Sequence, residues 1–126
     1  MGSITRTVEP DTYLTVFTVT DETDAVQVLT AIMAFLLEAP TQRVLWDIRS
    51  GSLTALSSHD LHLIVQRAGP FTLVRSGGRT AIVCSREVDF GLCRMFQAFV
   101  EEDRLPFEIR VTRDVVEARR WLETGF

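Results

Sequence analysis

Residues 80–84 read Thr-Ala-Ile-Val-Cys, an apolar run that lies between the Ser76-Gly77-Gly78 break and Ser85. So short a run of apolar and β-branched side chains, bounded by turn residues, indicates a strand. Strands that are apolar throughout are buried on both faces, and they occur in parallel sheets that carry helices on both sides. This stretch therefore predicts a strand in the middle of a mostly parallel sheet.

Strands and helices alternate on both sides of this run. The expected strands are at 43–48, 80–84 and 107–111, and the expected helices are at 58–67, at about 89–102 and after Asp114. Ser85 or Asp89 is expected to open the second of these helices, and Asp114 is expected to cap the last. Alternation of this kind implies right-handed crossover connections between parallel strands.

The N-terminal third adds an antiparallel pair. Residues 3–8 and 13–19 are rich in β-branched and aromatic side chains and are separated by turn residues. A helix over about 22–38 follows, with Asp21 or Thr20 as its expected cap. The predicted fold class is α/β: a mixed sheet of about five strands with an antiparallel opening hairpin and four helices, in the order ββαβαβαβα.

Composition indicates one globular unit. The chain has 126 residues, of which 46% are hydrophobic and 24% charged, and it shows neither repeats nor a linker, so a single domain over 1–126 is expected. All 13 basic residues are arginine, yet they are scattered and the net charge is −4. This charge distribution argues against nucleic acid as a partner.

The chain is expected to be cytoplasmic. Cys84 and Cys93 both lie in apolar runs, which predicts buried, reduced thiols. The first ten residues lack the apolar core of a signal peptide. The longest apolar stretch, residues 25–37, is too short to span a bilayer.

Four segments resemble the SpoIIAA-like family, a divergent branch of the STAS (sulfate transporter and anti-sigma-factor antagonist) domains. They are VLWDIRSGSLTALSSHDL (44–61), RTAIVCS (79–85), DFGLCRMFQAF (89–99) and IRVTRDVVEARRWL (109–122). The order of elements matches over nearly the whole chain. The resemblance implies a mixed sheet covered by helices, related in shape to the lipid-carrying CRAL-TRIO domains, with no enzymatic activity. No cofactor is expected for this chain.

The family's regulatory serine corresponds to Ser57 or Ser58. Anti-sigma-factor antagonists carry Asp-Ser-Ser-Gly-Leu here and accept phosphate on the first serine, whereas this chain reads Leu-Ser-Ser-His-Asp-Leu over 56–61. The missing Asp and Gly weaken the transfer of a phosphorylation switch. Ser57, three residues before Asp60, also fits a capping box, which explains the serine without any regulation.

Two other groups of polar residues invite a functional interpretation. In the loop Arg75–Arg79, two glycines between two arginines could turn backbone N–H groups towards an anion, or could simply form a tight turn. His59 and His62 share one helix face, but no further metal ligand accompanies them, so no metal site is predicted. Asp47, at the end of a strand, has no identifiable nucleophile and is interpreted as a surface or ion-paired carboxylate.

The first helix is unusually apolar. Eleven of residues 25–37 are apolar, whereas a helix that covers one sheet face needs only a stripe. Three explanations are open: burial within the domain, a protein interface, or contact with lipid. If Val28 and Phe35 face the sheet, Leu29, Met33 and Leu37 turn partly elsewhere, which predicts a homodimer or another apolar partner at that surface.

These observations favour a non-enzymatic binding or adaptor domain. Its expected ligand is an apolar or amphipathic molecule held between the sheet and helix 58–67, with Arg75 or Arg79 meeting any acidic head group. The alternative is a regulatory switch that docks a partner protein and is gated at Ser57 or Ser58.

Overall fold

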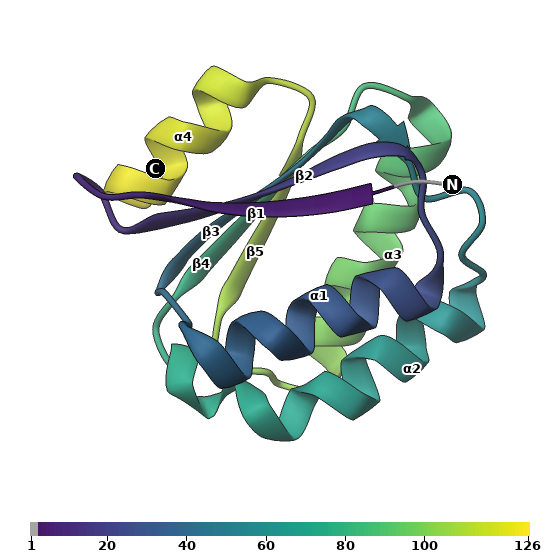
Figure 1. Ribbon diagram of the computed structural model, residues 1–126, viewed down its shortest axis with the longest axis horizontal. Coiled ribbons are helices and arrows are strands. Elements are labelled where there is room, and N and C mark those ends of the chain that lie inside the picture. Colours follow the sequence, from purple (N-terminus) through teal and green to yellow (C-terminus); the bar gives the residue numbers. More distant parts are fainter. Residues whose placement is uncertain (1–2) are drawn as a thin grey trace.

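The computed structural model describes residues 3–126, so Met1 and Gly2 of the predicted domain lie outside the described residues. The elements along the chain are β1 (Ser3–Glu9), β2 (Leu14–Glu22), α1 (Ala25–Glu38), β3 (Arg43–Ser52), α2 (Ser58–Ala68), the 3₁₀ helix η1 (Gly69–Arg75), β4 (Arg79–Val83), α3 (Glu87–Glu102), β5 (Glu108–Thr112) and α4 (Val115–Thr124). This is the predicted order ββαβαβαβα with one added 3₁₀ helix (Figure 1).

One five-stranded sheet has the spatial order β1-β2-β3-β4-β5. β1 and β2 are antiparallel, and every later pair is parallel, as predicted. The β2–β3 register shifts between Thr18 and Thr20, and pairing then resumes to Glu22. This extra pairing makes both strands longer than the sequence pattern indicated.

Helices cover the two faces of the sheet unequally. α1, α2 and α3 lie against one face, and α4 lies alone against the other (Figure 1). Ala81 and Val83 of β4 pack with α4, whereas Ile82 and Cys84 belong to the core on the three-helix side. Thr80, Ala81, Ile82, Val83 and Cys84 are all buried, so the predicted double burial of this run is confirmed.

The first residues of α1 and α3 differ from those that the sequence indicated. α1 starts at Ala25 with Asp24 as its cap, not at 22 after Asp21 or Thr20, because β2 continues through residues 20–22 to pair with β3. α3 starts at Glu87 after Arg86, so Asp89 lies inside its first turn and Ser85 before it. Asp114 caps α4 as predicted.

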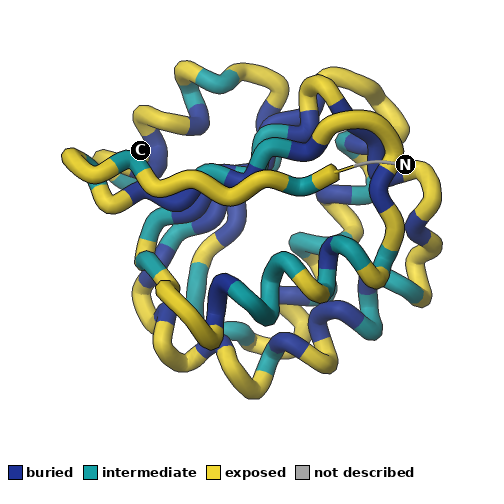
Figure 2. The backbone as a smooth tube through the Cα atoms, in the orientation of Figure 1, coloured by how far each residue is buried: buried dark blue, intermediate teal, exposed yellow. Residues whose placement is uncertain are grey.

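The apolar circumference of α1 is mostly covered by the chain itself. Val28, Phe35 and Leu36 are buried, and Leu29 and Met33 are half-buried. Figure 2 shows buried and half-buried residues along most of α1. Two residues of α1 are largely exposed: Leu37 at 66% and Val26 at 74%. Between residues 3 and 126, no helix combines the length and the apolar character that crossing a membrane requires.

Candidate functional site

Two cavities lie between the sheet and the layer formed by α1, α2 and α3. Each has a volume of about 60 Å³. Both are lined by the same five side chains, which must therefore stand between them: Ile32, Trp46, Ile64, Thr80 and Phe96. We call the two cavities together the apolar chamber. It lies between the sheet and α2, the region where the sequence analysis expected a ligand.

Aromatic rings form one wall of the apolar chamber. Phe17 stacks on Trp46 with ring centroids 4.2 Å apart, and its edge meets Phe35 at 5.5 Å. On the far side, Leu53, Leu56 and Cys93 continue an apolar surface. Such a surface suits a hydrocarbon or aryl group, because burying it releases water from apolar area on both partners.

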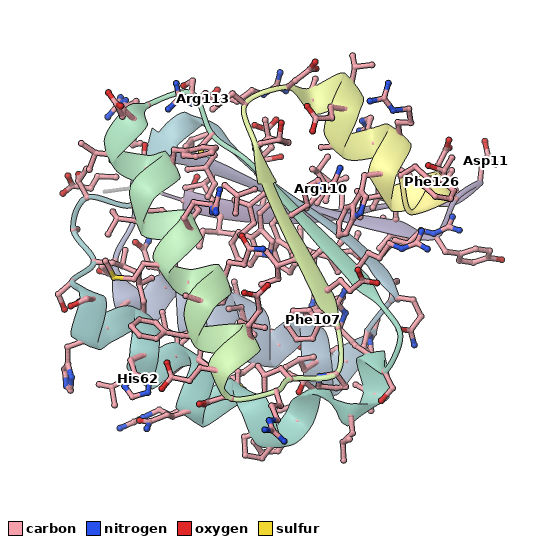
Figure 3. The ribbon with its side chains drawn as sticks, turned by 180° about the vertical axis from the view of Figure 1, so that it is seen from behind. Asp11, His62, Phe107, Arg110, Arg113 and Phe126 are labelled. Atoms are coloured by element: carbon pink, nitrogen blue, oxygen red, sulfur yellow. The ribbon has the colours of Figure 1, made fainter. Side chains whose placement is uncertain are left out.

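Arg75 places a positive charge at one end of this chamber. Only 4% of the residue is exposed, and its guanidinium lies 4.7 Å from the Phe107 ring centroid and 5.7 Å from that of Phe35. Figure 3 shows Phe107 at the start of β5, beside the α3–β5 connection. Burial lowers the pKa of Arg75 to about 10, which leaves it charged at neutral pH.

Arg75 donates its hydrogen bonds to carbonyl and hydroxyl oxygens. Its Nε donates to Thr41 O at 2.9 Å, its Nη2 to the carbonyl oxygens of Gln42 and Arg79 at 3.1 Å, and its Nη1 to Thr80 Oγ1 at 2.8 Å. A guanidinium has five N–H groups. Within residues 3–126, one Nη1 hydrogen thus lacks an acceptor and no carboxylate forms an ion pair with Arg75.

A surface groove borders the chamber at η1. The groove has a volume of about 590 Å³ and lies between η1 and the α3–β5 connection. Of the two cavities of the chamber, one is lined by Arg75, and we call it the Arg75 cavity. Val65, Thr72 and Leu105 line both this cavity and the groove, so they form the wall between the two. Leu73, at the groove, is 73% exposed, which gives the outer side an apolar lip.

The loop after Arg75 is a tight turn and does not form the anion nest considered from the sequence. Gly77 has φ +81°, and its N–H donates to Pro106 O at 2.9 Å. The N–H of Gly78 donates to Arg75 O at 2.8 Å, and that of Arg79 to Gln42 O at 2.7 Å. These donors are occupied by carbonyl groups, so the backbone offers no cradle for an anion here.

Arg79 and Asp47 lie on the α4 side of the sheet, away from the chamber. The Arg79 guanidinium donates to Leu122 O at 3.1 Å and so closes the C-terminal end of α4. The structure therefore does not bring Arg79 together with Arg75 as a second head-group ligand. Asp47 pairs with Arg49 at 2.8 Å, and the hydrogen bonds from Arg49 lower the pKa of Asp47.

Ser57 is the N-cap of α2. Its Oγ accepts from Asp60 N at 3.1 Å, and Asp60 Oδ2 accepts from Ser57 N at 2.9 Å, which is the capping box suggested by the sequence. Ser58 is exposed in the first turn. His62 lies beside α3 (Figure 3), its ring 4.9 Å from that of Phe99. In the part of the chain described, no three His, Cys, Asp or Glu side chains gather into a metal-binding group.

Asp89 is a buried polar residue that the sequence analysis treated only as a helix start. Its Oδ1 accepts from Leu53 N at 2.8 Å and from Ser52 Oγ at 3.3 Å, which fastens the end of β3 to α3. Its Oδ2 has no partner among residues 3–126. Cys84 and Cys93 are free and buried nearby, and a hydrogen bond with Cys84 raises the pKa of Cys93. An acid in the first turn of a helix is a common pattern, so only tertiary structure distinguishes this one.

The chain is similar in structure to an uncharacterised protein of the DUF3478 family with a SpoIIAA-like fold from Shewanella loihica PV-4. The TM-score is 0.54 at 21% sequence identity, and the match covers 96% of this chain and 93% of the other. The fold is thus SpoIIAA-like, as the sequence resemblance implied. No family model and no curated protein sequence matches the chain.

Proposed function

We propose that this chain is a non-enzymatic binding domain for an amphipathic acid, a molecule with an apolar tail and an anionic head group. The observation that carries the proposal is the buried Arg75 on the wall of the apolar chamber, which among residues 3–126 has one N–H without an acceptor and no ion pair with a carboxylate. Burying an unpaired charge is costly, and a ligand carboxylate would supply the missing counter-ion.

The tail would occupy the chamber by moving side chains rather than strands. Each cavity of about 60 Å³ is small beside the roughly 300–1,000 Å³ of ordinary ligand pockets. Ile32, Ile64 and Phe96 line both cavities, so turning them aside would join the two into one longer space. A ligand of medium chain length fits this arrangement better than a long one.

Leu105 is the proposed gate. It lines both the surface groove and the Arg75 cavity, and it is only half-buried. A ligand that entered from the groove would displace this one side chain to reach the guanidinium. The regulatory alternative at Ser57 and Ser58 has less support, because Ser57 Oγ already caps α2 and a phosphate there would face Asp60.

Calorimetric titration with octanoate and with 1-octanol tests the proposal. Octanoate is expected to bind more tightly by about tenfold or more, equal to ~1.4 kcal/mol, because only it pairs with Arg75. Ile64→Phe should weaken octanoate binding by filling the chamber without touching the hydrogen bonds of Arg75. Val116→Phe, on the exposed face of α4, adds the same ring elsewhere and should leave binding unchanged.

Equal affinities for octanoate and 1-octanol would show that Arg75 takes no part in ligand binding. Absence of binding by both, together with a native mass spectrum that shows no copurifying amphiphile, would refute the function as a whole.

A further inference from the structure

β1 is an edge strand with an open outer side. It pairs with β2 over all seven residues from Ser3 to Glu9, and no other strand of the described chain lies beyond it. Figure 1 shows β1 in front of the sheet, and Figure 2 shows it exposed along most of its length. The unpaired N–H and C=O groups of such an edge are a template for another strand.

The two edges of the sheet differ in protection. At β5, which has five residues, Gln97 Nε2 donates to Ile109 O at 3.1 Å and occupies an edge carbonyl. β1 has no bulge in its register, no Pro and no Lys. Its one cation, Arg6, is ion-paired with Glu38 of α1 and so does not project outward as a guard. Proteins that remain monomeric protect long edge strands with bulges, prolines or outward-pointing charged side chains.

We infer that the chain forms a homodimer in which β1 pairs antiparallel with β1 of a second copy. The two-fold axis would pass through Arg6, perpendicular to the sheet, because that register alone pairs all seven residues. Ile4 then lies opposite Val8 of the second copy, and Thr5 opposite Thr7. These are pairs of β-branched side chains, which stabilise neighbouring strands. Each copy uses the same surface, as a closed two-fold interface requires.

The charges next to this axis are balanced within each copy. Arg6 would face Arg6 of the second copy, a contact that is unfavourable by itself. Each Arg6 brings its own Glu38, however, so each copy would contribute a neutral ion pair to the contact. The net charge at the contact is zero, which weakens the repulsion between the two Arg6 side chains, and groups that are already paired lose only part of their hydration.

The flank of α1 beside β1 is shaped for a second helix. Glu38 turns towards β1, and Ala34 and Ala31 lie one and two turns before it on the same side of the helix. Their small side chains leave room for α1 of the second copy. The sequence analysis expected the interface at other residues of α1, among them Leu29 and Leu37. Leu29 lines a groove against α2, and Leu37 is exposed.

Sedimentation equilibrium of the full chain over a range of concentrations tests the dimer. The wild type should show twice the chain mass, and Val8→Lys should weaken the dimer at least about tenfold. Val8 is 48% exposed, so the monomer tolerates the change. Val116→Lys on α4, where the valine is 69% exposed, is the matched control and should remain dimeric.

Hydrogen exchange supplies the second readout. Dilution to monomer, or Val8→Lys, should deprotect alternate amides of β1 and leave those of β5 unchanged. A wild type that stays monomeric at every concentration would overturn the inference. It would also be overturned if Leu37→Lys dissociated a dimer that Val8→Lys left intact, because that result would assign the contact to the outer face of α1.

Discussion

Arg75 is surrounded by groups from four separate places in the chain. Its acceptors come from residues 41–42 before β3, from Arg79 and Thr80 of β4, and its aromatic neighbours from α1 and the start of β5. The sequence marked Arg75 only as one of two loop arginines. Local pattern could not separate it from Arg79, because burial is decided by partners that are distant in sequence.

Ser57 carries a prediction that separates capping from regulation. Ser57→Ala should lower the free energy of unfolding by about 0.5–2 kcal/mol, because the N–H of Asp60 loses its acceptor. Ser57→Asp should be tolerated, since aspartate also caps helices. Urea denaturation at neutral pH measures both changes.

Ser58→Ala is the control for this position, because Ser58 is exposed and takes no part in the capping box. It should change stability by no more than about 0.5 kcal/mol. If Ser57→Asp abolished the binding of a partner protein at unchanged stability, Ser57 would be a regulatory site as well as a cap.

At the level of elements, order and type could be predicted but bounds could not. Capping residues and apolar periodicity placed both ends of α2 to within one residue, and Asp114 marked the start of α4. The start of α1 was misplaced because residues 20–22 carry helix-capping chemistry yet pair with residues 50–52 of β3. Tertiary pairing overrode a local signal, and no single-segment pattern contains that information.

Two glycines test how far each element depends on its surroundings. A Cβ on Gly91 of α3 would meet nothing within 4 Å, so Gly91→Ala should raise the free energy of unfolding by about 0.4–1 kcal/mol through helix propensity. A Cβ on Gly78 would lie 2.6 Å from Gln42 O, so Gly78→Ala should lower it by about 1–3 kcal/mol. Denaturant unfolding measures both. Equal effects of the two changes would show that the contact at Gly78 relaxes without cost.

For the whole molecule, the fold was more predictable than the site. The apolar composition of strand 80–84 is enough to predict that it is buried on both faces. The alternation of strands and helices along the chain then limits the possible topologies. The apolar chamber, by contrast, arises where residues of β2, β3, β4, α1, α2 and α3 converge. Only its general place, between the sheet and α2, followed from the expected layering.

The ion pair between Glu9 and Arg119 joins the two ends of the chain across the α4 face. Arg119 Nη2 lies 2.8 Å from Glu9 Oε2, with the two side chains 46% and 39% exposed. The hydrogen bond from Arg119 lowers the pKa of Glu9 from its ordinary 4.5. A carboxyl group whose pKa is lower in the folded state stabilises the fold above its unfolded pKa, and this contribution disappears as pH falls through the folded pKa.

Arg119→Met should therefore cost only about 0.2–1 kcal/mol at pH 7, because solvent screens an exposed pair. The cost should shrink as pH falls below about 4.5 and vanish once Glu9 is protonated in both states. Added salt at pH 7 should reduce it as well. Arg120→Met is the control, since exposed Arg120 forms no ion pair within residues 3–126. Urea unfolding at several pH values gives the comparison. A loss that stayed constant down to pH 2 would mean that the stem of Arg119 stabilises α4 by packing rather than by its charge.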